Sequence, residues 1–396
     1  MTGDFRGRVP TLWHGRGIAR QTTTRLTAGR DTLVFADSAV APSFLVGPPA
    51  RTMLVEARAV DVAVVQAMAR EISRRPPHMI VAFGGGTVLD ASKIAALALA
   101  RGRVFDYAIG HAAKAALTLL PDAPPPVDIV AVPTTLGTSS ETNSVAVLQN
   151  EHGHRLLVGR ALRPRHAVLD PCNLATLSSA SVREGALEAL LRLAGASTSP
   201  RGDSRGSRDA SALGAALLTA VAQGTASAAA RLRLARLSAA TQRTAALRGE
   251  DPYSARHWYV ANEVAFRLGV RKMVATAAVI AAVWDRIGAG DPRWGHRASL
   301  HGFWSHVAAA AALPDDPSAG IAALIDRWAI PRPPRPSDSE IRRISAAIET
   351  SWGHRRPMLP GLVEEDFRDV LRDSRWSAPS VGEDHRPPMF RREEVK

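Results

Sequence analysis

Cysteine is nearly absent from this chain of 396 residues, which contains only Cys172. A single cysteine excludes an intrachain disulfide and a zinc site built from several thiolates. Long apolar runs are missing too, because the longest, from Val274 to Trp284, is well short of the roughly 18 residues that cross a bilayer. The amino-terminal residues show no signal-peptide pattern. We therefore expect a cytoplasmic protein without a membrane-spanning segment.

Lysine is also scarce, since only four of the 50 basic residues are lysines and the rest are arginines. The formal net charge of +13 would by itself favour nucleic acid as a partner. However, the basic residues are scattered, aromatic residues make up only 5% of the chain, and no nucleic-acid-binding motif is present. The arginine excess is typical of a GC-rich coding bias. We expect no nucleic-acid partner, although a positive field also attracts acidic small molecules or peptides.

The order of apolar patterns predicts two domains. Strand patterns at Thr32–Asp37, Thr52–Glu56 and Met79–Phe83 alternate with an amphipathic helix at Ala59–Arg74, which indicates a parallel sheet with its ligand at the carboxyl ends of the strands. After Leu177 the strand patterns disappear and helical periodicity continues. We predict an α/β N-terminal dinucleotide-binding domain over residues 1–172, an all-α C-terminal domain over 173–376, and a disordered tail over 377–396. Helices of the second domain are expected at residues 210–230, 257–268, 274–284, 320–328, 340–349 and 364–371, and residues 199–208 are expected to form an exposed loop.

Three consecutive glycines join the strand that ends at Phe83 to a helical pattern. Glycines have no Cβ, so backbone N–H groups can approach a diphosphate, and the following helix N-terminus adds partial positive charge. The spacing differs from the G-x-G-x-x-G dinucleotide fingerprint, and a strand-to-helix turn without a ligand is the alternative. The run nevertheless resembles the GGGS-x-x-D-x-x-K signature of the iron-containing (group III) alcohol dehydrogenase and dehydroquinate synthase-like superfamily. The resemblance implies that a nicotinamide cofactor is bound by Gly84, Gly85, Gly86, Thr87, Asp90 and Lys93.

A hydroxyl-rich loop follows the next apolar strand. The run from Pro133 to Glu141 resembles the P-T-T-x-G-T-G-S-E motif of the same superfamily, in which this loop lies beside the adenine and nicotinamide parts of the cofactor. On its own, such a cluster is more often a helix N-cap. Ser139 stands where the family has glycine, which is acceptable if this position does not need a positive φ. The resemblance implies that further cofactor contacts come from Thr134, Thr135, Thr138 and Ser139.

Asp37 ends the first predicted strand, where a ribose-binding acid is expected. The family carries an aspartate at the corresponding strand end. A carboxylate there would accept hydrogen bonds from ribose hydroxyls and repel a 2′-phosphate, so NAD is favoured over NADP. The alternative is an aspartate that only shapes the turn.

The resemblance weakens at the positions of the family's metal ligands. Members that use a metal hold a divalent ion with an acidic residue and two histidines, and the ion polarises the substrate oxygen. Glu188 aligns with the acidic ligand, but Arg192 stands four residues later, where histidine is common. Asn262 and Phe266 replace the histidines of an H-x-x-x-H-x-L-G pattern, and Lys272 lies where a P-H-G histidine is expected. We expect no bound metal, with a site relocated to other histidines such as His257 or His301 as the alternative.

The residues that replace the ligands suggest a different chemistry. If Lys272 or Arg271 points inward, its charge could pair with Glu188 and stabilise a developing alkoxide in place of the metal. Lys272, Glu188 and Arg271 are therefore the candidate catalytic residues. The alternative is that the cations face solvent and the ancestral pocket is inactive.

The resemblance implies three functions that the sequence leaves open. The first is an NAD(P)-dependent dehydrogenase that oxidises an alcohol, or reduces the carbonyl, without metal, in specialised biosynthesis and on a small molecule or a peptide, as in daptide maturation. The second is an inactive cofactor-binding scaffold for another biosynthetic enzyme. The third is a dehydroquinate synthase-like cyclase, which the missing histidines argue against. A homodimer or a partner enzyme is compatible with all three.

Overall fold

The α/β half of the protein is built on one parallel sheet. The structure is a computed structural model that describes residues 10–40, 50–200 and 204–378. Six strands lie in the order β1-β9-β6-β4-β2-β3, and every neighbouring pair is parallel. In chain order these strands are β1 (Thr11–His14), β2 (Thr32–Asp37), β3 (Arg51–Val55), β4 (Met79–Gly84), β6 (Asp128–Pro133) and β9 (His166–Leu169).

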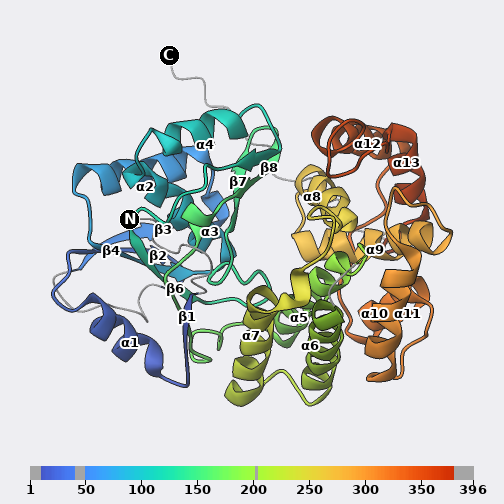
Figure 1. Ribbon diagram of the computed structural model, residues 1–396, viewed down its shortest axis with the longest axis horizontal. Coiled ribbons are helices and arrows are strands. Elements are labelled where there is room, and N and C mark those ends of the chain that lie inside the picture. The colour runs from blue at the N-terminus through green and yellow to red at the C-terminus, as the bar shows by residue number, and fades with distance from the viewer. Residues whose placement is uncertain (1–9, 41–49, 201–203, 379–396) are drawn as a thin grey trace.

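Helices cover both faces of this sheet (Figure 1). On one face, buried side chains of α2 (Val62–Arg74), α3 (Gly86–Ala96) and α4 (Val104–Ala112) form a core with Leu33, Phe35 and Ile80. On the other face, α1 (Ile18–Thr27) packs against the opposite side chains of the same strands. Strands buried on both faces are nearly continuous apolar runs, which is why their positions could be predicted closely.

A second, smaller sheet extends from the α/β half toward the helical half. It consists of β5 (Leu117–Leu119), β7 (Val145–Asn150) and β8 (Gly153–Val158), with β7 and β8 joined as an antiparallel hairpin. The sequence analysis did not predict this sheet. The strand β8 contacts α8 of the helical half, so the small sheet forms part of the junction between the two halves.

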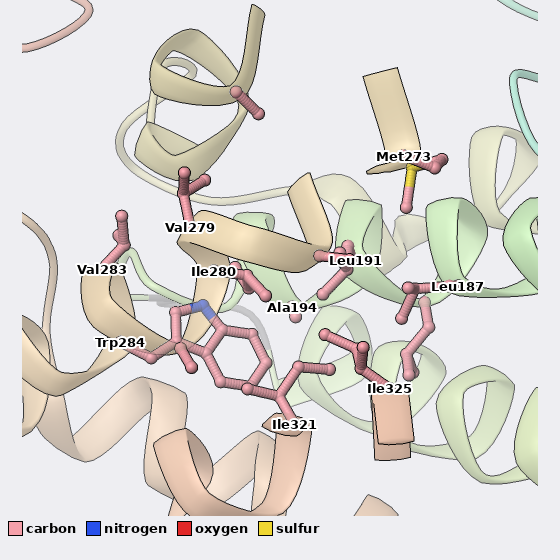
Figure 2. Packing of buried hydrophobic residues seen from close by; sticks show 14 of the residues in the cluster. Leu187, Leu191, Ala194, Met273, Val279, Ile280, Val283, Trp284, Ile321 and Ile325 are labelled. Atoms are coloured by element: carbon pink, nitrogen blue, oxygen red, sulfur yellow. The ribbon is translucent and has the colours of Figure 1, made fainter. Parts of the chain in front are cut away.

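The second half is helical, as predicted, and its core lies between packed helices. Figure 2 shows Trp284 of α9 beside Ile321 of α11, with Leu187 and Leu191 of α5 turned toward the same space. The helices are α5 (Ser179–Ala196), α6 (Ser204–Ala222), α7 (Ala228–Arg243), α8 (Arg256–Leu268), α9 (Lys272–Gly288), α10 (Arg297–Ala309), α11 (Pro317–Arg327), α12 (Asp338–Trp352) and α13 (Glu364–Asp373). No helix of the described segments is long and apolar enough to cross a membrane.

Three expectations about the helical half need correction. The helix predicted over residues 210–230 is two helices, because α6 ends at Ala222 and Ser227 caps a new helix by accepting a hydrogen bond from the Ala230 N–H. The loop predicted over 199–208 is helical from Ser204 onward, and α10 was not predicted. At the predicted tail, Ser377 pairs with Pro334 in a β-bridge, and residues 379–396 lie outside the described residues. The division at residue 172 remains a prediction.

The two halves meet at an unusually close backbone contact. Gly137, in the loop after β6, has a φ of 110°, and a Cβ on this residue would lie 2.6 Å from the Cα of Gly185 in α5. A Cβ on Gly185 would in turn meet the carbonyl of Leu136. Only glycine at both positions allows the loop to lie directly on the helix.

We expect Gly185→Ala to lower the free energy of unfolding by about 1–3 kcal/mol, because the added methyl group overpacks the junction. Urea denaturation measures this. The matched control is Gly302→Ala in α10, where a Cβ meets no atom within 4 Å and alanine should raise stability by up to about 1 kcal/mol. Equal effects of the two variants would show that the junction tolerates a side chain.

Candidate functional site

The glycine turn between β4 and α3 lies at the carboxyl edge of the sheet. β4 ends at Gly84 and α3 begins at Gly86. A Cβ on Gly85 would lie 3.3 Å from the Thr135 side chain, and a Cβ on Gly86 would lie 3.1 Å from that of Thr138. The two predicted cofactor motifs therefore pack against each other. Because the N-cap Gly85 has no side chain, it offers no cap of its own to the first N–H groups of α3, and such groups suit an anion.

Asp37 ends β2, the strand next to β4 in the sheet. One of its carboxylate oxygens accepts a hydrogen bond from the Ala39 N–H at 3.1 Å. The structure thus brings Asp37 and the glycine turn to the same edge, as predicted. That this carboxylate holds a ribose stays a prediction.

Lys93 and Asp90 belong to a network of buried hydrogen bonds rather than to an open binding site. The Lys93 ammonium is fully buried and donates to Asp90 Oδ1 at 3.1 Å, to Ser140 Oγ at 2.8 Å and to the carbonyl oxygen of Val145. Burial lowers the pKa of Lys93, and the Asp90 carboxylate partly opposes this. Asp90 also accepts from the Val147 N–H at 2.9 Å. These two residues therefore tie α3 to the hydroxyl-rich loop and to β7, and their direct contact with a cofactor stays a prediction.

Ser139 adopts the left-handed conformation that glycine would normally supply. Its φ is 52°, so the condition under which serine would be accepted there without strain is not met. A non-glycine residue there costs on the order of 1–2 kcal/mol. The Ser139 and Ser238 hydroxyl oxygens lie 2.7 Å apart in a buried hydrogen bond, which offsets about 1 kcal/mol of that strain. The hydroxyl thus holds the loop against α7, and its predicted contact with a cofactor stays a prediction.

Glu141 is a site residue that the sequence analysis missed. Its side chain is buried, and desolvation raises its pKa to about 7, although Arg192 and Lys93 lower it. At neutral pH the residue is therefore poised between its neutral and charged forms. The only signal in the sequence was its place at the end of the hydroxyl-rich motif.

A cavity of about 280 Å³ lies between the two halves of the protein. Asp90, Thr138 and Asn143 line it from the α/β half, and Glu188, Arg192 and Lys272 line it from the helical half. The remaining lining residues are Val145, Val147, Leu156, Leu191, Gln242, Leu247, Ala255, His257, Trp258, Tyr259, Met273 and Thr276.

Lys272 and Glu188 meet in this cavity. The Lys272 Nζ lies 3.5 Å from Glu188 Oε1 and 4.0 Å from the centroid of the Trp258 ring. The exposed fractions of the lysine and glutamate side chains are 28% and 18%. Burial lowers the pKa of Lys272, and Glu188 raises it. The Thr138 hydroxyl donates to Glu188 at 3.4 Å, so this ion pair lies beside the predicted cofactor loop.

Arg192 connects the region around the Glu188 carboxylate to the hydroxyl-rich loop. Its guanidinium donates to the carbonyl oxygens of Gly137 and Thr138 and, at 2.7 Å, to the Thr241 hydroxyl. Burial lowers the pKa of Arg192 below its ordinary value, and Glu188 raises it. The residue that stands four positions after Glu188 is thus a structural tie between α5, α7 and the hydroxyl-rich loop.

Arg271 does not join this cluster. Its guanidinium donates to Glu184 at 2.8 Å, and 61% of its side chain is exposed. Burial raises the pKa of Glu184, and Arg271 lowers it. The two adjacent cations therefore occupy different surroundings, with Lys272 facing the cavity and Arg271 facing solvent.

The donor set in the cavity does not suit a divalent cation. The only imidazole in its lining is His257, and its pKa is lowered to about 3, chiefly by burial and also by Lys272. His301 lies outside the cavity, with its ring 3.4 Å from Asp315. Among residues 10–40, 50–200 and 204–378, no group of three or more His, Cys, Asp or Glu side chains is placed to hold a metal. A carboxylate flanked by Lys272 and Arg192 faces positive charge already, so another cation would be repelled.

Comparisons with known proteins find relatives for part of this chain. The family model described as "iron-containing alcohol dehydrogenase" matches residues 53–171. A curated phosphonoacetaldehyde reductase from Streptomyces viridochromogenes is 41% identical over 188 residues, which covers 46% of this chain and 47% of that protein. The chain thus aligns with about half the length of this relative.

Solved structures match over almost the whole chain, although at low identity. The NADH-dependent butanol dehydrogenase A of Thermotoga maritima has a TM-score of 0.73 at 16% identity and covers 92% of this chain and 96% of its own. The sulfoacetaldehyde reductase of Bifidobacterium kashiwanohense, solved with NAD+, has a TM-score of 0.69 at 18% identity and covers 93% and 97%. Residues 53–171 thus match the iron-containing alcohol dehydrogenase family model, and the chain as a whole has the same fold as these two solved structures.

Proposed function

We propose that this protein is an NAD(P)-dependent oxidoreductase that interconverts an aldehyde and an alcohol without a metal. The observation that carries the proposal is the lysine–glutamate pair in a cavity that is also lined by Asp90 and Thr138, one residue from each predicted cofactor motif. The relatives support the reaction class, since their names describe aldehyde reductases and an NADH-dependent alcohol dehydrogenase.

The residues at the sheet edge fit a nicotinamide dinucleotide. Gly85 and Gly86 leave backbone where a Cβ would press on threonine side chains, and the α3 N-terminus favours a diphosphate. Asp37 favours NAD over NADP, because a second anion beside its carboxylate would be repelled. Thr134, Thr135 and Thr138 complete the proposed cofactor contacts. When bound, the reduced nicotinamide supplies the hydride that converts the carbonyl carbon to an alcohol carbon.

Lys272 supplies the positive charge that the carbonyl oxygen needs. Its ammonium would donate a hydrogen bond to this oxygen and then a proton as the oxygen gains negative charge, so that one hydride and one proton complete the reduction. Glu188 holds the ammonium in place and favours its charged form. In the reverse direction, the neutral amine would accept the alcohol proton. The same role is filled by a Lewis-acidic ion in metal enzymes, and here the cations around Glu188 leave no suitable donor set for one.

We expect Gly85→Asp to abolish NADH binding while the fold survives. A carboxylate at the N-terminus of α3 would occupy the position of the diphosphate and repel it, whereas the Cβ itself meets only the Thr135 side chain at 3.3 Å. NADH fluorescence titration measures the affinity. Gly110→Asp in α4 is the control, because a Cβ there meets no atom within 4 Å. Unchanged affinity in a folded Gly85→Asp protein would remove the cofactor site from the glycine turn.

We expect Lys272→Met to reduce turnover about a hundredfold, on the order of 3 kcal/mol of transition-state stabilisation, and to leave NADH affinity unchanged. Because the pKa of Lys272 is lowered, the ammonium loses its proton below the ordinary lysine value of 10.5. In the reduction direction, kcat/KM should therefore fall as pH rises through that lowered pKa.

Steady-state kinetics across pH measures both effects. Arg271→Met is the matched control, since this neighbouring cation pairs with Glu184 outside the cavity, and its turnover should stay within about twofold of wild type. The alkaline decline should vanish in Lys272→Met. Full activity in that variant, or the same alkaline decline, would assign the proton to another group, and an inactive wild type would favour the scaffold function.

We expect the dialysed protein to contain no stoichiometric zinc or iron and to keep its NADH affinity and turnover in the presence of a chelator, because its imidazole ligands are missing. Elemental analysis and the same kinetics test this. One tightly bound ion per chain, lost in His257→Ala, would show that the metal site has moved.

A further inference from the structure

We infer that the substrate is a small aldehyde or alcohol with an apolar side group, in contrast to the anionic aldehydes named for two relatives of this chain. The inference rests on the proposed function and concerns the same cavity. It follows from how the charged groups of the cavity are already used and from what lines the remainder.

Each cation of the cavity already has its partners. Lys272 lies between Glu188 and the Trp258 ring. The guanidinium of Arg192 is occupied by two carbonyl oxygens and a hydroxyl. Behind the wall, the Lys93 ammonium is saturated by oxygen atoms, including those of Asp90 and Ser140. In the proposed reaction the remaining N–H of Lys272 goes to the carbonyl oxygen of the substrate. A phosphonate or sulfonate elsewhere in the same molecule would therefore have to displace one of the other contacts, and this would leave a buried carboxylate or carbonyl without its donor.

Most of the rest of the lining is apolar, and its other polar side chains, such as Asn143, Gln242 and Thr276, are uncharged. Val145, Val147 and Leu156 come from the small sheet, and Leu191, Leu247, Trp258, Tyr259 and Met273 come from the helical half. An anion placed among these side chains would lose its hydration without gaining a charged partner, which is strongly unfavourable. An apolar group of the same shape would instead gain by burial.

The size of the cavity also restricts the substrate. A volume of about 280 Å³ lies just below the usual range for small-molecule sites, which begins at roughly 300 Å³. A short branched or ring-containing aldehyde fits this space, and a longer molecule could place only its reactive end there.

Three aldehydes of nearly the same shape but different charge separate the effect of substrate charge from that of substrate size. In phosphonoacetaldehyde, sulfoacetaldehyde and 3,3-dimethylbutanal, the CH₂–CHO group carries a phosphonate, a sulfonate and a tert-butyl group. With the full chain and NADH, we expect kcat/KM for 3,3-dimethylbutanal to exceed both others by about a hundredfold or more, as for a charge buried without a partner. Equal or higher kcat/KM for either anionic aldehyde overturns the inference and leaves the proposed function intact.

A binding measurement tests the inferred substrate class separately from the proposed function. If no aldehyde is reduced, the proposed function fails. The substrate class is then tested by measuring the affinity of 3,3-dimethylbutan-1-ol and of 2-hydroxyethanesulfonate for the protein saturated with NAD+. Tighter binding of the apolar alcohol by about tenfold or more supports the inference. Tighter binding of the sulfonate, or equal binding of the two, overturns it.

A matched pair of variants places the effect in the cavity. Leu156→Lys adds a cation to the apolar lining and should raise relative kcat/KM for sulfoacetaldehyde at least about tenfold. Leu119→Lys is the control, because Leu119 lies on β5 of the same sheet, 54% exposed and outside the cavity. An unchanged preference in a folded Leu156→Lys protein overturns the assignment of this wall to the substrate. If that variant does not fold, the wild-type comparison of the three aldehydes still decides.

Discussion

The architecture of the site depends on one steric constraint, the direct contact of two glycine backbones at Gly137 and Gly185. Because neither residue has a Cβ, the hydroxyl-rich loop lies on α5 closely enough for Arg192 to donate to the Gly137 and Thr138 carbonyls. The same approach brings the Thr138 hydroxyl to Glu188. Residues of the sheet-edge motifs and the carboxylate of Glu188 thus line one cavity. The hydrogen bonds of Arg192 fix the loop relative to the helical half.

Two cations lie near Glu188, the residue that the sequence resemblance aligns with an acidic metal ligand. Lys272 and Arg192 together carry two positive charges beside this carboxylate, as many as a divalent ion carries. An ammonium differs from a metal ion because it can also release a proton, and burial lowers the pKa of Lys272.

Local features of the sequence predicted the fold closely. Features that depend on contacts between distant residues could not be predicted in this way. The strand Thr32–Asp37 and the glycine turn were placed correctly, because a buried parallel strand is an apolar run and a triple glycine is a strong turn signal. The helix at 210–230 was wrong because alanine-rich periodicity continues through the break at Ser227. The roles of Arg192 and Glu141 could not be read from sequence, since both depend on partners roughly 50 residues away.

Ser139 shows how a sequence motif and the observed backbone conformation can be combined. The motif resemblance has glycine there, and Ser139 adopts a left-handed backbone at the cost of local strain. The hydrogen bond to Ser238 of α7 ties that strained residue to the helical half, as Arg192 ties the adjacent carbonyls. A loop held so firmly to the helical domain leaves little freedom for the two halves to move apart at this point. This wall of the cavity is therefore preorganised, and most of the lining that it helps to form is apolar.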